Sequence, residues 1–197
     1  MKAQPGIVLF DLGGVLLPFD QAKRVRAVAE ALRVTEFAAS AAMTPELFAR
    51  LGDGRRDEAE FAAAFTDLAG RHVTAAEAKD LIISVFEAPN APLWAFAATL
   101  ARRITVGAFS DNPAFVSEAF PAGARLAPLF WSSEIGALKP SAAFDWVEAS
   151  VGVAPERIIF VDDTLANVDA ARARGWDAIL FRSNDDVIAE FAQRGLP

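Results

Sequence analysis

Residues 7–20 read IVLFDLGGVLLPFD, a short apolar run followed by a carboxylate and two glycines. The run Ile7–Phe10 is typical of a strand that is buried on both faces of a parallel sheet. Asp11 ends this run, and Gly13 and Gly14 let the backbone turn sharply and come close to a ligand. Aspartate is rarely buried unless it is paired or bound to a cation. The stretch therefore predicts a functional carboxylate at the edge of a sheet.

Further short apolar runs predict four more strands, at residues 104–109, 129–131, 158–161 and 178–181. Helical patterns lie between the later runs. Phe144, Val147 and Val151 follow one another at spacings of three and four, and a helix within residues 164–174 ends at Gly175. Alternating strands and helices predict an α/β fold: a Rossmann-like parallel sheet flanked by helices, with right-handed crossovers.

The segment between the first two strands is far too long for one crossover and carries only helical signals. Val25, Val28 and Leu32 form one apolar helical stripe, and Thr74 with Glu77 has the spacing of a capping box at a helix start. We therefore expect an all-α cap subdomain inserted into the α/β core. The expected boundaries are residues 1–17 and 89–197 for the core and residues 18–88 for the cap.

The composition is that of an ordinary globular protein, with 53% hydrophobic and 23% charged residues in a chain of 197. A net charge of -7 argues against nucleic acid or an anionic membrane as a partner. No apolar stretch is long enough to span a bilayer. The chain contains no cysteine, which excludes disulfides and thiolate metal sites. A cytoplasmic location is the expectation, and the oligomeric state stays open.

Polar residues follow the strands at the edge where an open parallel sheet binds ligands, beyond the carboxyl ends. They are Asp11, Ser110–Asn112, Lys139 in the loop after the third strand, and Asp162–Asp163. The carboxylates suit a hard divalent cation, and a hydroxyl with an ammonium suits a neighbouring phosphate. Each residue also has a structural alternative. Ser110, Asp163 or Thr164 could cap the following helix, and Lys139 could be exposed.

Four blocks of the sequence resemble, in order and spacing, the four motifs of the haloacid-dehalogenase-like (HAD-like) hydrolases. They are FDLGGVLL at 10–17, FSDN at 109–112, GALKP at 136–140 and FVDDTLANVDAARARGW at 160–176. Residues 54–61 also resemble a recurring segment of the all-helical cap that one branch carries between motifs one and two. The resemblance spans nearly the whole chain and implies a phosphatase of that branch.

By this resemblance, Asp11 is the nucleophile that attacks phosphorus and forms an aspartyl-phosphate. Lys139 would neutralise charge between the phosphate and this nucleophile. The implied residues for the phosphate are Ser110, Asp111, Asn112 and Lys139. The implied ligands of Mg2+ are Asp11, the carbonyl of Gly13, Asp162 and Asp163. The implied substrate is a small phosphorylated metabolite, a sugar phosphate being one candidate.

Position 13 departs from the family pattern. Most phosphatases of the family carry a second Asp there, which protonates the leaving oxygen and later activates water. Gly13 has no side chain for this step, which contributes about 100- to 10,000-fold in typical enzymes. Some sugar-phosphate phosphatases of this branch also have Gly here, so loss of activity does not follow. Asp20 could be a surrogate acid, or it could only cap the helix that begins at Gln21.

Two alternative functions stay open. A catalytically weak or inactive member of the fold would bind a phosphorylated ligand. A 2-haloacid dehalogenase would also lack the second Asp. It needs no metal, however, and the resemblance would then predict small hydroxyl residues in place of Asp162 and Asp163.

Further candidates lie around these motifs. Asn167 lies one helical turn after Asp163, so its amide can face the same cleft and orient a carboxylate or the lysine. The cap residues expected near the cleft are Phe19, Phe48 and Arg50.

Overall fold

The computed structural model describes residues 4–54, 58–84 and 86–197. Within these residues, a sheet of five parallel strands has the order β3-β2-β1-β4-β5. The strands are β1 (Ile7–Phe10), β2 (Thr105–Ser110), β3 (Leu129–Trp131), β4 (Ile158–Asp162) and β5 (Asp177–Leu180). The predicted Rossmann-like parallel sheet is confirmed, with β1 in its centre.

Three strands differ by one residue from the prediction. The second is Thr105–Ser110 and not 104–109, and the fifth is Asp177–Leu180 and not 178–181. In each case a polar residue belongs to the strand because it pairs with a neighbouring strand, Ser110 with Trp131 and Asp177 with Ile159. The fourth strand likewise extends by one residue, to Asp162. An apolar run in the sequence indicates burial and not backbone pairing. A prediction based on such runs therefore leaves out polar residues that pair at the ends of strands.

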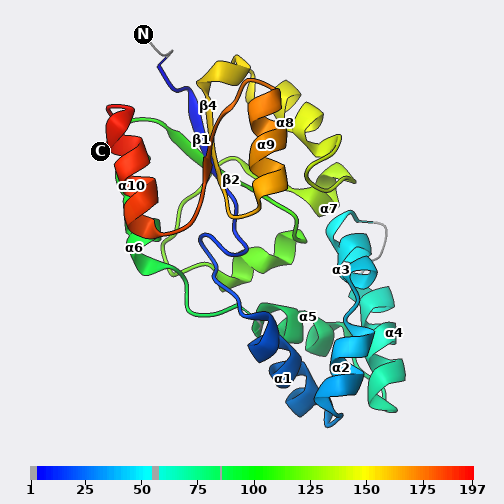
Figure 1. Ribbon diagram of the computed structural model, residues 1–197. Helices are drawn as coiled ribbons and strands as arrows, with labels where there is room; N and C mark the ends of the chain where they lie inside the picture. Colours follow the sequence, from blue (N-terminus) through cyan, green and yellow to red (C-terminus); the bar gives the residue numbers. More distant parts are fainter. Residues whose placement is uncertain (1–3, 55–57, 85) are drawn as a thin grey trace.

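Helices cover both faces of the sheet (Figure 1). α6 (Ala91–Leu100) and α10 (Asn184–Gln193) lie on one face, and α8 (Ala143–Val151) and α9 (Leu165–Ala173) lie on the other. Phe10 belongs to the apolar cluster of the first face with Phe191 of α10, whereas Leu9 belongs to the second with Phe144 of α8. This two-sided burial explains why the run Ile7–Phe10 is continuously apolar. Short helical turns complete the core: η1 (Ala114–Ala119), α7 (Ser132–Ile135) and η2 (Pro155–Arg157).

The segment between β1 and β2 is helical, as predicted, and lies beside the sheet as a separate group of helices (Figure 1). The Thr74–Glu77 capping box is present, with the Glu77 carboxylate accepting from the Thr74 N–H at 2.8 Å. Residues 55–57 of the segment that resembles the family cap lie outside the described residues. The helices are α1 (Gln21–Leu32), α2 (Glu36–Ala42), α3 (Pro45–Gly52), α4 (Glu58–Ala69) and α5 (Ala75–Ser84).

The helical insertion contacts the core in several places, among them an ion pair between Lys79 of α5 and Glu118 of η1 at 3.0 Å. At the connections to the sheet, Phe19 forms an isolated antiparallel bridge with Phe86, and the two rings meet edge to face at 6.4 Å. On another side, the Ser132 hydroxyl donates a hydrogen bond to the carbonyl of Gly52. The exact boundaries between core and cap stay a prediction. In the described parts of the chain, no helix combines the length and the apolar character that a membrane crossing requires.

Candidate active site

The ends of β1 and β4 meet the lysine of the third motif at one point. Lys139 Nζ is 3.0 Å from Asp11 Oδ1 and 2.7 Å from Asp162 Oδ2, and it donates to the carbonyl of Phe109 at 3.1 Å. The side chains of Lys139 and Asp162 are 1% and 0% exposed, and Asp11 is also buried. The alternative in which Lys139 is an exposed lysine is therefore wrong. The structure brings together residues that were predicted from separate motifs.

Burial and mutual charge set the ionisation of this group. Burial alone would lower the pKa of Lys139, but the carboxylates of Asp11 and Asp162 raise it above its usual value, so the ammonium stays charged. Burial raises the pKa of Asp11 to about 8, and the charge of Lys139 offsets only part of that effect. Burial also raises the pKa of Asp163, and the charge of Asp162 adds to the rise. A bound cation would relieve this crowding of carboxylates.

Asp162 is held by neutral donors as well as by the lysine. The Asn167 side-chain amide donates to both carboxylate oxygens, at 3.2 and 3.1 Å, and the Thr164 backbone N–H donates to Oδ1 at 2.8 Å. Asn167 therefore has the orienting position expected from the sequence. Thr164 is the N-cap residue of α9, but no side-chain hydrogen bond caps this helix among the described residues.

Asp11, Asp162 and Asp163 together have the donor set of a divalent-cation site. One carboxylate oxygen from each residue lies within 4.8 Å of the others. Hard cations such as Mg2+ and Ca2+ take oxygen ligands of this kind. Gly13, whose carbonyl is the fourth predicted ligand, lines the cavity onto which Asp11 and Asp163 open. The residues present therefore fit the predicted metal.

Residues 110–112 do not all reach the cavity. Asp111 and Asn112 line it, whereas Ser110 is fully buried and accepts a hydrogen bond from the Asn112 side-chain amide at 2.9 Å. Asp111 Oδ1 accepts from the Lys139 backbone N–H at 2.9 Å, which ties this strand end to the lysine loop. Ser110 does not cap η1, which begins after Pro113 without a side-chain cap. The predicted contact of Ser110 with a phosphoryl oxygen stays a prediction.

The cavity has a volume of about 270 Å³ and is lined by residues of the sheet ends and of the helical insertion. Phe19 and Phe48 line it, as predicted, but Arg50 is exposed and is not among the described lining residues. Positions two residues apart on a helix point in nearly opposite directions, so Arg50 faces away when Phe48 faces the cavity. The residues contributed from the insertion side are Phe19, Arg24, Phe48, Leu51, Ile82 and Phe86.

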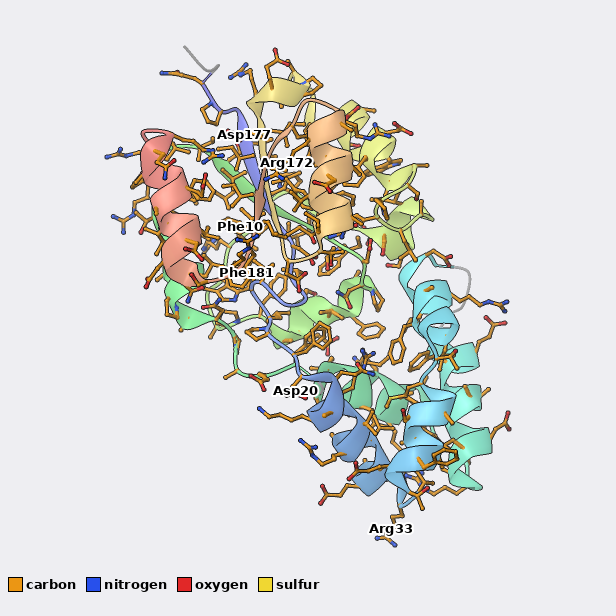
Figure 2. All side chains as sticks on the ribbon, viewed as in Figure 1. Phe10, Asp20, Arg33, Arg172, Asp177 and Phe181 are labelled. Carbon is orange, nitrogen blue, oxygen red and sulfur yellow. The ribbon has the colours of Figure 1, made fainter. Side chains whose placement is uncertain are left out.

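Asp20 caps α1 and does not line the cavity. Its carboxylate accepts from the Lys23 backbone N–H at 2.9 Å, and the residue is exposed. Figure 2 shows Asp20 at the junction where the chain leaves the sheet and enters α1, with Arg33 at the far end of that helix. The capping interpretation of Asp20 is confirmed. Its position gives no support to a role as surrogate acid.

Gly13 has room for a side chain. A Cβ there would lie 3.7 Å from the Phe19 ring and 3.8 Å from the Asn112 side-chain amide, which are ordinary contacts. Its φ also lies outside the left-handed region. The backbone therefore does not require glycine at position 13, and an aspartate could be accommodated there.

Arg24 is the charged residue among the described lining residues of the insertion, and it was not predicted from the sequence. It lies one helical turn after Asp20, and its guanidinium carbon is 3.6 Å from the centre of the Phe48 ring on α3. Arginine is mostly exposed in folded proteins. Arg24 precedes Val25 of the apolar stripe, but no spacing in the sequence shows that α1 turns this position towards a cavity.

No protein-family profile matches the chain. A curated relative, the D-ribitol-5-phosphate phosphatase of Bacteroides thetaiotaomicron, is 25% identical over 182 residues, which cover 86% of this chain and 88% of the relative. The solved structure of a predicted HAD-like family hydrolase from Porphyromonas gingivalis has a TM-score of 0.82 at 24% identity, covering 97% and 98% of the two chains. A HAD family enzyme of Bacteroides thetaiotaomicron, solved with magnesium and inorganic phosphate, has a TM-score of 0.82 at 18% identity, covering 95% and 99%.

The parallel sheet, the motif residues gathered at one cavity and these similarities define the class of the protein. The chain has the fold of the HAD-like hydrolases and resembles them in the residues of its site, as the sequence motifs predict. Its curated relative within this class, similar over most of both chains, is a phosphatase of a phosphorylated sugar alcohol.

Proposed function

We propose that the protein is a Mg2+-dependent phosphomonoester hydrolase of small phosphorylated metabolites, which reacts through an aspartyl-phosphate on Asp11. The observation that supports this most directly is the position of Lys139 Nζ between Asp11 and Asp162, beside the third carboxylate of Asp163. A fold alone requires no such group, because a buried charge cluster costs free energy unless it is compensated.

Asp11 has the position of a nucleophile. The rigid end of β1 and the ammonium of Lys139 hold its carboxylate at the cavity. In the first step a carboxylate oxygen bonds to phosphorus while the bond to the ester oxygen breaks, and the leaving oxygen, which departs nearly as an alkoxide, takes up a proton from water. In the second step water attacks the same phosphorus, inorganic phosphate leaves and the carboxylate is restored. Lys139 offsets the negative charge on the transferring oxygens.

Asp11, Asp162, Asp163 and the carbonyl of Gly13 would hold Mg2+. When bound, the ion neutralises charge on the transferring phosphoryl group. Asn167 fixes the carboxylate of Asp162 from behind, which is the usual function of residues that surround metal ligands. At the end of β2, Asp111 and Asn112 line the cavity, and Ser110 lies directly behind the Asn112 amide.

The size of the cavity supports a small substrate. Its volume of about 270 Å³ is close to the lower end of the range for ligand pockets. The apolar side chains of the insertion would exclude water from the phosphoryl group during reaction. The curated relative acts on D-ribitol 5-phosphate, so phosphorylated polyols and sugars belong first in a substrate panel.

The test is phosphate release from an aryl phosphate and from a panel of phosphorylated metabolites, with Mg2+ and with chelator. Asp11→Asn, purified in parallel, controls for contaminating phosphatases. We expect turnover by the wild type with Mg2+ alone. If no ester is hydrolysed with Mg2+ while phosphorylated ligands still raise the Tm, the protein is the inactive phospho-ligand-binding member considered above.

The 2-haloacid dehalogenase alternative is not favoured by the site. Asp162 and Asp163 converge on Asp11 within 4.8 Å, where that alternative predicts small hydroxyl residues. Release of halide from a 2-haloacid in the presence of chelator would revive it.

A further inference from the structure

Arg24 is a half-buried cation at the cavity that has no hydrogen-bond or ion-pair partner among the described residues. Its Nε is buried and makes no hydrogen bond, and no ion pair joins it to a carboxylate of the described residues. Burial lowers the pKa of Arg24 to about 10 and no neighbouring charge raises it, but the guanidinium still carries its charge at neutral pH. An uncompensated charge in this position costs free energy in the empty protein.

Aromatic rings hold the guanidinium in place without using its N–H groups. Its central carbon lies 3.6 Å from the centre of the Phe48 ring. That ring packs edge on against Phe61 at 5.5 Å, and Phe61 packs against Phe65 at 4.8 Å. Phe61 and Phe65 are fully buried, so the Phe48 ring under Arg24 packs against the interior of the insertion. A guanidinium stacked on an aromatic face keeps its N–H edge free for a ligand.

The part of the cavity where the phosphate is proposed to bind has a cationic side chain of its own. Lys139 lies on the core side, next to the carboxylates that would hold Mg2+. Arg24 comes from α1 on the insertion side, where the other described lining residues are apolar. The cavity therefore offers a second positive charge, which comes from the insertion and not from the sheet ends that carry the proposed phosphate site.

We infer that Arg24 is a specificity-determining residue that binds a carboxylate of the substrate, so that the preferred substrates are phosphorylated hydroxy acids or sugar acids. This inference rests on the proposed phosphatase function. The planar guanidinium can donate two parallel hydrogen bonds to a carboxylate. A carboxylate brings one negative charge to one unpaired guanidinium, whereas a second phosphate would bring about -1.5 to -2.

The test compares esters that differ only in the distal group. Suitable pairs are 3-phosphoglycerate with glycerol 3-phosphate, and 6-phosphogluconate with glucitol 6-phosphate. The wild type should have the higher kcat/KM for the acid of each pair. Arg24→Gln should lower kcat/KM for the acids by about 10- to 100-fold, mainly through KM, as expected for hydrogen bonds to a charged group. It should change the values for the polyols by less than about threefold. Arg26→Gln, at an exposed position of the same helix, is the matched control. It should change kcat/KM neither for the acids nor for the polyols.

Equal losses for acid and polyol in Arg24→Gln, or no preference of the wild type for the acids, would overturn the inference. The Tm of the free protein separates recognition from folding. Removing an uncompensated charge should leave the Tm unchanged or raise it, whereas a lower Tm together with equal losses would show a structural role.

The inference and the proposed function can fail separately. If the wild type hydrolyses no ester with Mg2+, the proposed function is wrong, and binding becomes the test of Arg24. In that case 3-phosphoglycerate should raise the Tm of the wild type more than glycerol 3-phosphate does, and this difference should disappear in Arg24→Gln. The same Tm shift with both compounds in the wild type would refute the inference.

Discussion

Gly14 lies directly against the carboxylate of Asp163, so closely that a Cβ on Gly14 would stand 2.1 Å from Asp163 Oδ2. Gly14 also has a φ of 76°, in the left-handed region that side chains disfavour. The neighbouring Gly13 has neither constraint. The two glycines of the first motif therefore have different functions, and Gly14 is the one that gives the third carboxylate of the site its room.

We predict that Gly14→Ala destabilises the protein and weakens metal binding, whereas Gly13→Ala does neither. At position 14 the left-handed backbone costs about 1–2 kcal/mol for alanine, and the new methyl group displaces Asp163. At position 13 the change should stay within about 1 kcal/mol. Thermal unfolding of both variants with and without Mg2+ measures the two effects. Equal Tm values and equal responses to Mg2+ would contradict the prediction.

Asp11→Asn should abolish turnover and leave the protein folded. Removal of a nucleophile lowers kcat by about 10³-fold or more in enzymes of other classes. Lys139 keeps its contact with Asp162 at 2.7 Å, so its ammonium does not become unpaired. Steady-state kinetics with an aryl phosphate measure the loss of turnover. A far-UV circular dichroism melt checks that the variant is folded. Activity close to the wild type would mean that another carboxylate is the nucleophile.

The stabilisation by Mg2+ should increase as the pH rises from about 4 to about 8. Burial raises the pKa of Asp11 from 3.8 to about 8 in the metal-free protein. In this interval the folded state binds more protons than the unfolded chain, so the Asp11 contribution to stability is lost as the pH rises. A bound cation would compensate the negative charge that Asp11 acquires when its carboxyl loses its proton. At a Mg2+ concentration about 100-fold above Kd, the stabilisation amounts to about 2.7 kcal/mol. Melting curves with Mg2+ or chelator across this range test the prediction, and a Tm difference that stays constant with pH would refute it.

Without a side chain at position 13, the leaving oxygen departs nearly as an alkoxide. Turnover should therefore depend steeply on the acidity of the leaving group, with aryl and anomeric sugar phosphates favoured over ordinary alkyl phosphates. Gly13→Asp should reduce this dependence, since a Cβ fits at 3.7 Å from Phe19 without strain. A series of esters of graded leaving-group acidity, measured on both proteins, is the experiment. A flat dependence in the wild type would show that another residue of the cavity donates the proton.

The polar residues at strand ends could be predicted because parallel strands place their carboxyl ends along one edge. β1 lies between β2 and β4, so Asp11 and Asp162 are neighbours by pairing alone. The position of Arg24 could not be predicted in this way. It depends on the rotation of α1 within the insertion, which is set by packing between helices and leaves no period in the sequence. The orientation of α3, which turns Phe48 towards the cavity, likewise makes Arg50 an exposed residue. The burial of Ser110 behind Asn112 could not be predicted either, because it depends on the side-chain conformations of the two residues.

The position of β1 also has a consequence for the order of folding. Ile7–Phe10 is synthesised before the other four strands of this sheet, yet Ile7 pairs with Thr105 on one side and with Ile158 on the other. An apolar strand with two unpaired edges must therefore wait for most of the chain, and such edges promote aggregation. The helices of the insertion have local contacts and can form much earlier. We expect the docking of β4 onto β1 to limit the refolding rate, so that the centre of the sheet is the last part of the core to become stable.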